Sequence, residues 1–374
     1  MGPLRGHPEM EAEDHYQRGE ELRERCRFSE AVEAYREALR AYPPAETFGR
    51  LRCQKRIGDC LRMIGAFRDA EKAYRDALKL ARQRGDELEE ADCLVGLGLG
   101  QRALGELEEA KGNFQKALDL YQEYDDPEGE GFCLWAMGGM WRALGDLRRA
   151  KEAFQEALFL FEGMEDLWGQ GYCHCGLGGV ERVMGNYRES LDHYSRANQL
   201  LGEVDDAFGR AYSFCGMGNA HRMMGDFPRA LDYFARATEL YSEIGDKVSY
   251  AWTLWGEGTA LKMIRRLQEA EERFRRAQGL FSETGDGRGT IYCLLSLGEI
   301  RQLEGRVGDA AASLQRAEEV LEGKPFALER CHLRLYRWLL EGGDRGELEE
   351  IRGAYRKLGS HFLNSPPTLP LNLP

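Results

Sequence analysis

Long apolar runs and an excess of positive charge are both missing from this sequence of 374 residues. A membrane-spanning helix needs about 20 consecutive apolar residues, and no run approaches that length. The formal net charge is -13, whereas general nucleic-acid binding requires a basic face that neutralises phosphates. Residues 1–10 lack the apolar core of a secretory signal. We therefore expect a cytoplasmic protein that is not inserted in a membrane and binds no nucleic acid.

Catalytic and metal-binding motifs are also missing, because the sequence contains no HExxH motif, no CxxC pair and no P-loop. The run Gly96–Gly100 resembles part of a dinucleotide-binding loop, but no strand is predicted before it. In Cys173-His174-Cys175 the two thiols would point about 200° apart on a helix, so they cannot hold one ion together. We therefore predict that the protein is not an enzyme and holds no metal and no cofactor.

The cysteines follow a spacing that argues against disulfides. Five cysteines are spaced by multiples of forty residues: Cys53, Cys93, Cys133, Cys173 and Cys293. Ser213 and Thr253 occupy the two positions of the series that lie between the last two cysteines. A small residue that recurs once per repeat is a packing position, and stacked helices hold such positions roughly 10 Å apart. That spacing exceeds the reach of a disulfide. We expect free, mostly buried thiols.

A forty-residue period runs through most of the chain. Glycine recurs at Gly58, Gly98, Gly138, Gly178, Gly218, Gly258 and Gly298. Twelve residues later comes Ala70, Ala110, Ala150, Ser190, Ala230, Ala270 or Ala310. Four further on stands Tyr74, Phe114, Phe154, Tyr194, Phe234, Phe274 or Leu314, and three beyond that is always Ala. The first unit keeps the same offsets at Gly19, Ala31, Tyr35 and Ala38. Eight matched units indicate an internal repeat.

Each repeat reads as a helical hairpin. The spacings of four and three place Ala70, Tyr74 and Ala77 on one face of a helix. The earlier glycine lies in a preceding helix, where the missing side chain lets the two helices approach closely. Between them stands a turn such as Gly145-Asp146, in which Gly ends one helix and Asp caps the next. One hairpin cannot bury its apolar face alone, so the hairpins must stack.

This pattern resembles the tetratricopeptide repeat signature over roughly residues 12–328. The forty-residue version, with Leu-Gly-Asp turns and segments such as Ala207–Tyr212, is similar to Pins/LGN scaffolds and less closely to kinesin light chain. The resemblance implies an all-α fold, a right-handed superhelical solenoid of antiparallel helix pairs whose first helices line a concave groove. Those scaffolds usually carry Asn directly after the conserved Gly. Only Asn219 matches, so their partners are not carried over.

The predicted organisation begins with a flexible N-terminus, residues 1–11. Eight repeats follow, at approximately 12–50, 51–90, 91–130, 131–170, 171–210, 211–250, 251–290 and 291–328. Residues 329–359 read as a degenerate capping hairpin, in which Tyr336 and Trp338 would cover the last repeat. The Pro- and Leu-rich tail, residues 360–374, is expected to be flexible. The alternative is that this tail folds back into the groove.

One stripe of the first helices carries a cation four residues after the conserved Gly. Its members are Arg23, Arg62, Arg102, Arg142, Arg182, Arg222 and Lys262. A cation in the last turn of a helix interacts favourably with the helix dipole, and Lys would serve that purpose as well as Arg. The dominance of Arg favours a ladder whose planar forks bind carboxylates in the groove. Structural salt bridges and the dipole effect are the alternatives.

A second stripe lies six and three residues before the conserved Gly and shares the helix face of the first. Its members are Phe132, Trp135, Tyr172, Cys175, Tyr212, Cys215, Trp252, Trp255, Tyr292 and Leu295. Aromatic residues at helical spacing are commonly core residues, but beside cations they would suit an interaction surface. The candidate binding residues are the ladder from Arg62 to Lys262, the aromatic residues of this stripe, and Asn219.

These features predict a protein-protein interaction scaffold or adaptor. Its groove would bind an acidic, partly apolar segment of a partner protein or a peptide ligand. Each surface ion pair contributes little, so several contacts in register are needed and binding should be sensitive to salt. The alternatives are a regulatory protein that senses a small peptide and a structural subunit of a homo- or hetero-oligomeric assembly.

Overall fold

The computed structural model describes residues 8–363 and 365–374, and these residues form helices and connecting turns without a strand. The chain divides into two compact units. Unit 1 is Met1–Cys133 with Ile244–Asp246, and unit 2 is Leu134–Glu243 with Lys247–Pro374. Residues 1–7 of the expected flexible N-terminus lie outside the described residues.

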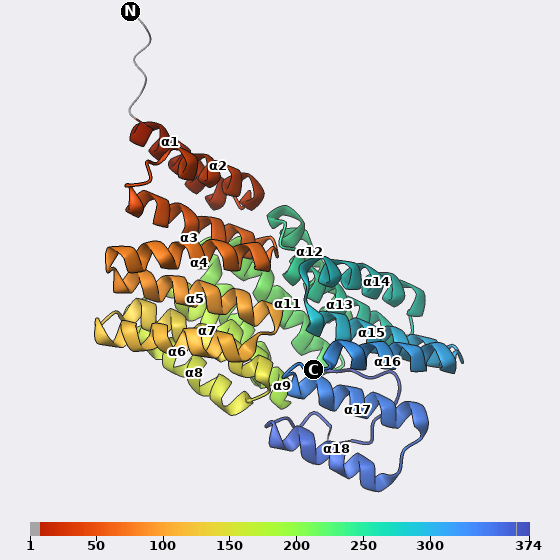
Figure 1. Cartoon of the computed structure of the whole chain (residues 1–374). Helices are drawn as coiled ribbons and strands as arrows, with labels where there is room; N and C mark the ends of the chain where they lie inside the picture. Colours follow the sequence, from red (N-terminus) through yellow and green to blue (C-terminus); the bar gives the residue numbers. More distant parts are fainter. Residues whose placement is uncertain (1–7, 364) are drawn as a thin grey trace, which may run out of the picture. The chain divides into compact units, whose positions relative to one another are not determined.

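Consecutive helices pair as antiparallel hairpins that stack side by side within each unit (Figure 1). Unit 1 holds α1 (Pro8–Glu24), α2 (Phe28–Ala41), α3 (Thr47–Met63), α4 (Phe67–Arg84), α5 (Glu87–Leu104), α6 (Leu107–Glu123) and the start of α7 (Pro127–Leu144). Unit 2 holds the rest of α7, α8 (Leu147–Gly163), α9 (Leu167–Met184), α10 (Tyr187–Glu203), α11 (Ala207–Met223), α12 (Phe227–Ile244), α13 (Lys247–Met263), α14 (Leu267–Thr284), α15 (Gly287–Leu303), α16 (Val307–Leu321), α17 (Ala327–Glu341) and α18 (Arg345–Lys357). The fold is an all-α helical-repeat solenoid. Each observed hairpin begins a few residues before the expected repeat boundary.

The turn inside each hairpin follows from its sequence. After α9, Gly185 adopts a φ of 105°, a left-handed conformation that glycine reaches without strain. The N–H groups of Gly185 and Asn186 then donate to the carbonyl of Glu181 at 3.0 and 2.9 Å. After α7, the Asp146 carboxylate accepts from the N–H of Arg149 at 3.0 Å and caps α8. These caps fix where each helix ends and the next one starts.

The aromatic residue of the second helix lies between two glycines in several repeats. In unit 2, methyl groups added at Gly178 and Gly216 would lie 2.9 and 2.1 Å from atoms of the Tyr194 ring. Gly178 belongs to the same hairpin as Tyr194, and Gly216 belongs to the next hairpin. The second glycine, two residues before the conserved one, was not identified from the sequence. It lets adjacent hairpins approach each other as closely as the first glycine lets the two helices of one hairpin.

Replacing Gly216 with alanine is expected to destabilise unit 2 by about 1–3 kcal/mol, because the new methyl must displace the Tyr194 ring. The matched control is Gly279→Ala in α14, where the methyl meets no atom within 4 Å. That change should instead stabilise the helix by about 0.4–1 kcal/mol. Urea denaturation of the two variants measures both effects. Equal stability of the variants would contradict the close-approach role of Gly216.

The last hairpin of unit 2 packs back on the first helices of the same unit. A methyl added at Gly145 would lie 3.2 Å from Ala327 Cβ. Tyr336 is fully buried against Gly298, so it covers the last repeat, whereas Trp338 donates to the Asp344 carbonyl of its own turn. After α18, the His361 N–H donates to the Met184 carbonyl at 2.9 Å. The chain therefore leaves α18 along the end of α9.

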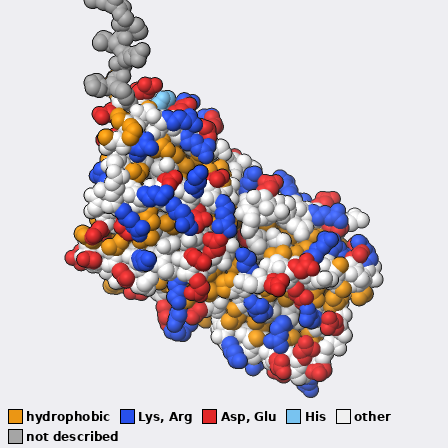
Figure 2. Space-filling view, in the orientation of Figure 1, with side chains coloured by type: hydrophobic (Ala, Val, Ile, Leu, Met, Phe, Trp, Pro, Cys, Tyr) orange, Lys and Arg blue, Asp and Glu red, His pale blue; other side chains and the backbone are white. Residues whose placement is uncertain are grey.

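The side chains are distributed as expected for a helical-repeat protein. All ten cysteines are free, and all but Cys26 and Cys215 are buried, which confirms the expectation from their spacing. Within the described part of the chain, every helix is too short or too polar to cross a bilayer. Basic and acidic side chains are intermixed over the face that Figure 2 shows, without a continuous basic surface.

Candidate functional site

The cation ladder lies on the first helices, but its members have different surroundings. Lys262 on α13 is 1% exposed and donates from Nζ to Glu299 Oε2 on α15 at 2.8 Å. Burial lowers the pKa of Lys262, and the Glu299 charge opposes that shift. The guanidinium of Arg142 instead occupies the space left by the missing side chain of Gly179. Glu299 and Gly179 both directly follow a conserved Gly, and each lies against the cation 37 residues earlier.

Arg222 on α11 is 0% exposed and has only neutral acceptors. Its Nε and Nη2 donate to Asn219 Oδ1 at 3.2 and 3.0 Å. Its Nη1 donates to the Leu373 carbonyl at 3.0 Å and to Asn372 Oδ1. The guanidinium carbon also lies 5.1 Å from the centroid of the Trp255 ring. Burial, together with the nearby charge of Arg182, lowers the pKa of Arg222 to about 9.

The segment Leu369–Pro374 contacts the same helices and supplies these acceptors. The Leu371 N–H donates to Glu299 Oε2 at 2.7 Å, and Asn372 Nδ2 donates to the Arg222 carbonyl at 2.9 Å. Leu371 and Leu373 are 4% and 2% exposed. We call the surface of α11, α13 and α15 that this segment contacts the inner face of unit 2.

This placement differs from the flexible tail expected from the sequence. The tail has few charges, which suggested that nothing would hold it. Its backbone is held instead by side chains of distant helices: Glu299, Arg222 and Arg265, whose Nη2 donates to the Leu369 carbonyl at 3.3 Å. The two leucines bury their side chains between these contacts. Residues of this segment thus contact the first helices α11 and α15.

A second buried polar cluster lies beside the inner face. The Arg288 guanidinium contacts Glu329, which is 0% exposed, at 2.7 Å. His332 is also 0% exposed, and its two ring nitrogens lie 2.6 Å from the Tyr355 hydroxyl and 3.1 Å from the Tyr292 hydroxyl. This cluster joins α15, α17 and α18.

Several residues of the aromatic stripe connect neighbouring repeats. Tyr172 donates from its hydroxyl to Asp206 at 2.9 Å, and Trp252 donates from Nε1 to Asp286 at 3.1 Å. Each acceptor precedes the first helix of the next hairpin. Trp135 Nε1 donates to the Tyr172 carbonyl at 3.2 Å, and Trp255 Nε1 donates to Ser296 at 3.2 Å. These donors are therefore engaged in packing between repeats.

The remaining candidate residues are placed as follows. Tyr212 packs against the core cluster around Tyr194, and Phe132 is half-buried on α7. Asn219 donates to the Cys215 carbonyl at 3.0 Å and accepts from Arg222. Arg62 lies beside the Tyr74 hydroxyl in unit 1, and Arg102 is half-buried on α5. The structure thus brings Arg222, Asn219 and Trp255 together, with Arg222 against the tail. Sequence reasoning missed Glu299 and the tail residues.

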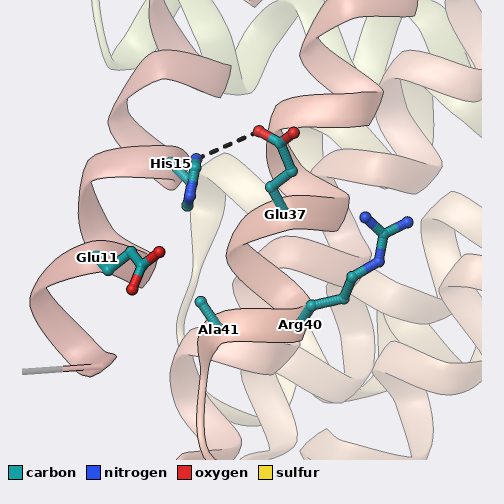
Figure 3. A pocket seen from close by; sticks show the side chains of 5 residues that line it. All are labelled: Glu11, His15, Glu37, Arg40 and Ala41. Atoms are coloured by element: carbon teal, nitrogen blue, oxygen red, sulfur yellow. Dashed lines mark ion pairs between the residues drawn. The ribbon is translucent and has the colours of Figure 1, made fainter.

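A hollow of unit 1 has a different character. It holds about 370 Å³ between α1 and α2, and Figure 3 shows His15 and Glu37 facing each other across it. His15 Nδ1 lies 3.3 Å from Glu37 Oε2. The hollow is open and lined by charged groups at the surface. Among the described residues, no group of three or more His, Cys, Asp or Glu side chains is arranged to hold a metal ion.

Comparisons with known proteins agree with this architecture. A family model described as "Tetratricopeptide repeat" matches residues 89–162, 173–243 and 210–283. A Rap protein complexed with competence and sporulation factor superposes with a TM-score of 0.67 at 15% identity, over 86% of this chain and 88% of that one. A search of curated protein sequences finds no match.

Two further solved structures are similar over nearly their whole length. The Rap conjugation gene regulator of the plasmid pLS20, in complex with the Phr peptide, has a TM-score of 0.60 at 12% identity, over 83% of this chain and 97% of that one. Aspartyl phosphate phosphatase F from Bacillus subtilis has a TM-score of 0.53 at 14% identity, over 98% and 99%. At such identities the likeness concerns the fold alone. Arrays of this fold carry surfaces that bind proteins or peptides.

Proposed function

Because the chain belongs to the tetratricopeptide repeat family, we propose that the inner face of unit 2 binds an extended segment of a partner protein that carries apolar and acidic side chains. The observation that carries this proposal is the position of residues 369–374. Their backbone groups are bound by Glu299, Arg222 and Arg265, and Leu371 and Leu373 are buried. A partner segment would take the place of this resident segment.

The chemistry of the inner face favours an extended ligand. Side chains of the helices, and not a sheet edge, supply the hydrogen bonds to the ligand backbone, so the segment needs no secondary structure of its own. Alternate residues bury their side chains, as Leu371 and Leu373 do, while Asn372 between them forms hydrogen bonds with Arg222. Two solved structures of similar fold are complexes, one with competence and sporulation factor and one with the Phr peptide. The proposal involves no catalytic step.

A fluorescent peptide with the sequence of residues 365–374 tests this function. In the full chain the tethered segment competes at an effective concentration of about millimolar. The variant Leu371→Asp/Leu373→Asp should release that segment and bind the probe at least about tenfold more tightly than the parent chain. Fluorescence polarisation measures both affinities.

Two further variants make the probe experiment decisive. Val307→Asp places the same charge at a position that is 53% exposed, and it should leave probe binding unchanged. Arg142→Glu/Arg182→Glu/Arg222→Glu, added to the released variant, should abolish binding. Circular dichroism shows whether each variant keeps its helices. If the folded, released variant fails to bind the probe, or binds it equally well after the triple change, the proposal is wrong.

A further inference from the structure

Two guanidinium groups, Arg222 on the inner face and Arg182 on the preceding first helix α9, form no ion pair among the described residues. Arg222 is fully buried and donates only to an Asn side chain on its own helix, to Asn372 and to a carbonyl. Arg182 on α9 has two buried nitrogens, Nε and Nη1, without an acceptor among the described residues. Neither residue forms an ion pair with any carboxylate in that part of the chain. Arg222 therefore places a positive charge without a counter-charge directly against Asn372, and the charge of Arg182 adds to it.

Two other cations of unit 2, the buried Lys262 and the half-buried Arg288, are neutralised by carboxylates. Lys262 faces Glu299 at 2.8 Å, and Arg288 faces Glu329 at 2.7 Å. A buried charge is costly unless a charge of opposite sign and hydrogen bonds compensate it. The Arg182 charge also contributes to the lowered pKa of Arg222, as repulsion between two like charges does. By this comparison, one carboxylate is missing from the inner face.

We propose that Arg182 and Arg222 form a carboxylate subsite, and that a segment bound to the inner face carries Asp or Glu where Asn372 now lies. This inference rests on the proposed function and specifies its ligand. The ligand is an extended stretch in which one acidic residue stands between two apolar residues. Asn372 is nearly isosteric with Asp, so the resident segment fills this subsite with the right shape but without the charge.

The neighbouring contacts restrict the ligand further. Glu299 Oε2 accepts the N–H of the residue before the acid, so that residue is not proline. A second acid at that residue would lie beside the Glu299 carboxylate. An acid at position 372 loses the donation that Asn372 Nδ2 makes to the Arg222 carbonyl. A charge-assisted bond to Arg222, which now donates to Asn372 Oδ1, outweighs that loss, because such bonds are about twice as strong as neutral ones.

Hydrogen exchange in the intact chain tests the subsite without any partner. The Leu371 N–H exchanges only when the segment leaves Glu299, so its exchange rate reports detachment of the tail. Asn372→Asp should slow this exchange by about tenfold, as expected for replacing a neutral by a charge-assisted bond. Adding Arg182→Gln or Arg222→Gln to Asn372→Asp should abolish this slowing of the exchange. Faster exchange in Asn372→Asp, or a gain that survives both Gln changes, overturns the inference.

Two probes separate this inference from the proposed function. Both are peptides of residues 365–374, one unchanged and one with Asn372→Asp, measured on the released variant Leu371→Asp/Leu373→Asp. Tighter binding of the acidic probe supports the carboxylate subsite. Equal binding, or tighter binding of the unchanged probe, overturns the subsite and leaves the proposed function standing. Binding of neither probe overturns both.

Discussion

Replacing Lys262 with methionine is expected to lower the free energy of unfolding by about 3–5 kcal/mol, because the change leaves a buried carboxylate without its counter-charge. Glu299 is 0% exposed, and its Oε1 has no hydrogen-bond partner among the described residues. Burial raises the pKa of Glu299, and the Lys262 charge opposes that rise. Without Lys262 the carboxyl group must take up a proton or open the inner face to water. Urea denaturation at neutral pH measures the loss.

Two matched variants identify the cause of that loss. Lys262→Met/Glu299→Leu removes both charges, and replacing a whole buried pair by apolar groups is often nearly neutral. Lys247→Met breaks the exposed pair with Glu283, in which the side chains are 51% and 58% exposed, and should cost less than about 1 kcal/mol. If Lys262→Met is as mild as Lys247→Met, the pair does not hold the inner face together. The double variant should still loosen the tail, because the Leu371 N–H loses its acceptor.

The repeat architecture was predictable because it depends on spacing within a few helical turns. A glycine, a small residue and a large apolar or aromatic residue recur at fixed offsets, as Gly178, Ser190 and Tyr194 do in one repeat. The structure predicted for one hairpin could therefore be applied to the others. The second glycine position, two residues before each conserved glycine, was missed because its residue type varies between repeats. It is Gly216 in one repeat but Ala136 and Ser296 in others. Other small residues also occupy this position, so it does not stand out as a glycine.

The candidate site was predictable only in part, because its contacts join distant segments. The sequence places Arg182, Arg222 and Lys262 on one stripe, but the partner that neutralises Lys262 lies 37 residues later. The tail contacts Arg222 across about 150 residues, and no local pattern encodes that contact. The role of the aromatic stripe as a ligand platform stays a prediction. Its Tyr172 and Trp252 side chains donate hydrogen bonds to an Asp of the next repeat. In both pairs the donor and the acceptor are separated by 34 residues, a spacing that is visible in the sequence.

Lowering the pH from 7 to 4.5 is expected to cost the protein about 2–3 kcal/mol of stability through His332 alone, at about 1.4 kcal/mol per pKa unit. His332 is fully buried between the hydroxyls of Tyr355 and Tyr292. Burial, with a further contribution from the charge of Arg288, lowers its pKa from 6.5 to about 3. The neutral ring matches this environment, because one nitrogen donates to a hydroxyl and the other accepts from one.

The sign of the effect follows from the depressed pKa. Above pH 6.5 the imidazole is neutral in both states, and its full contribution to stability is present. Between 6.5 and about 3 the unfolded chain binds a proton that the folded chain refuses, so stability falls as the pH falls. His174, whose pKa burial lowers to about 4, acts in the same direction. The comparison must therefore be made between the parent chain and a variant of His332.

His332→Gln isolates this effect, because Gln can donate and accept a hydrogen bond but cannot bind a proton in this pH range. At pH 7 the variant should be the less stable protein. The difference in unfolding free energy should then shift by about 2–3 kcal/mol in favour of the variant at pH 4.5. Urea denaturation of both proteins at several pH values gives the two curves. If the curves run parallel from pH 7 to 4.5, the buried imidazole does not contribute to acid lability.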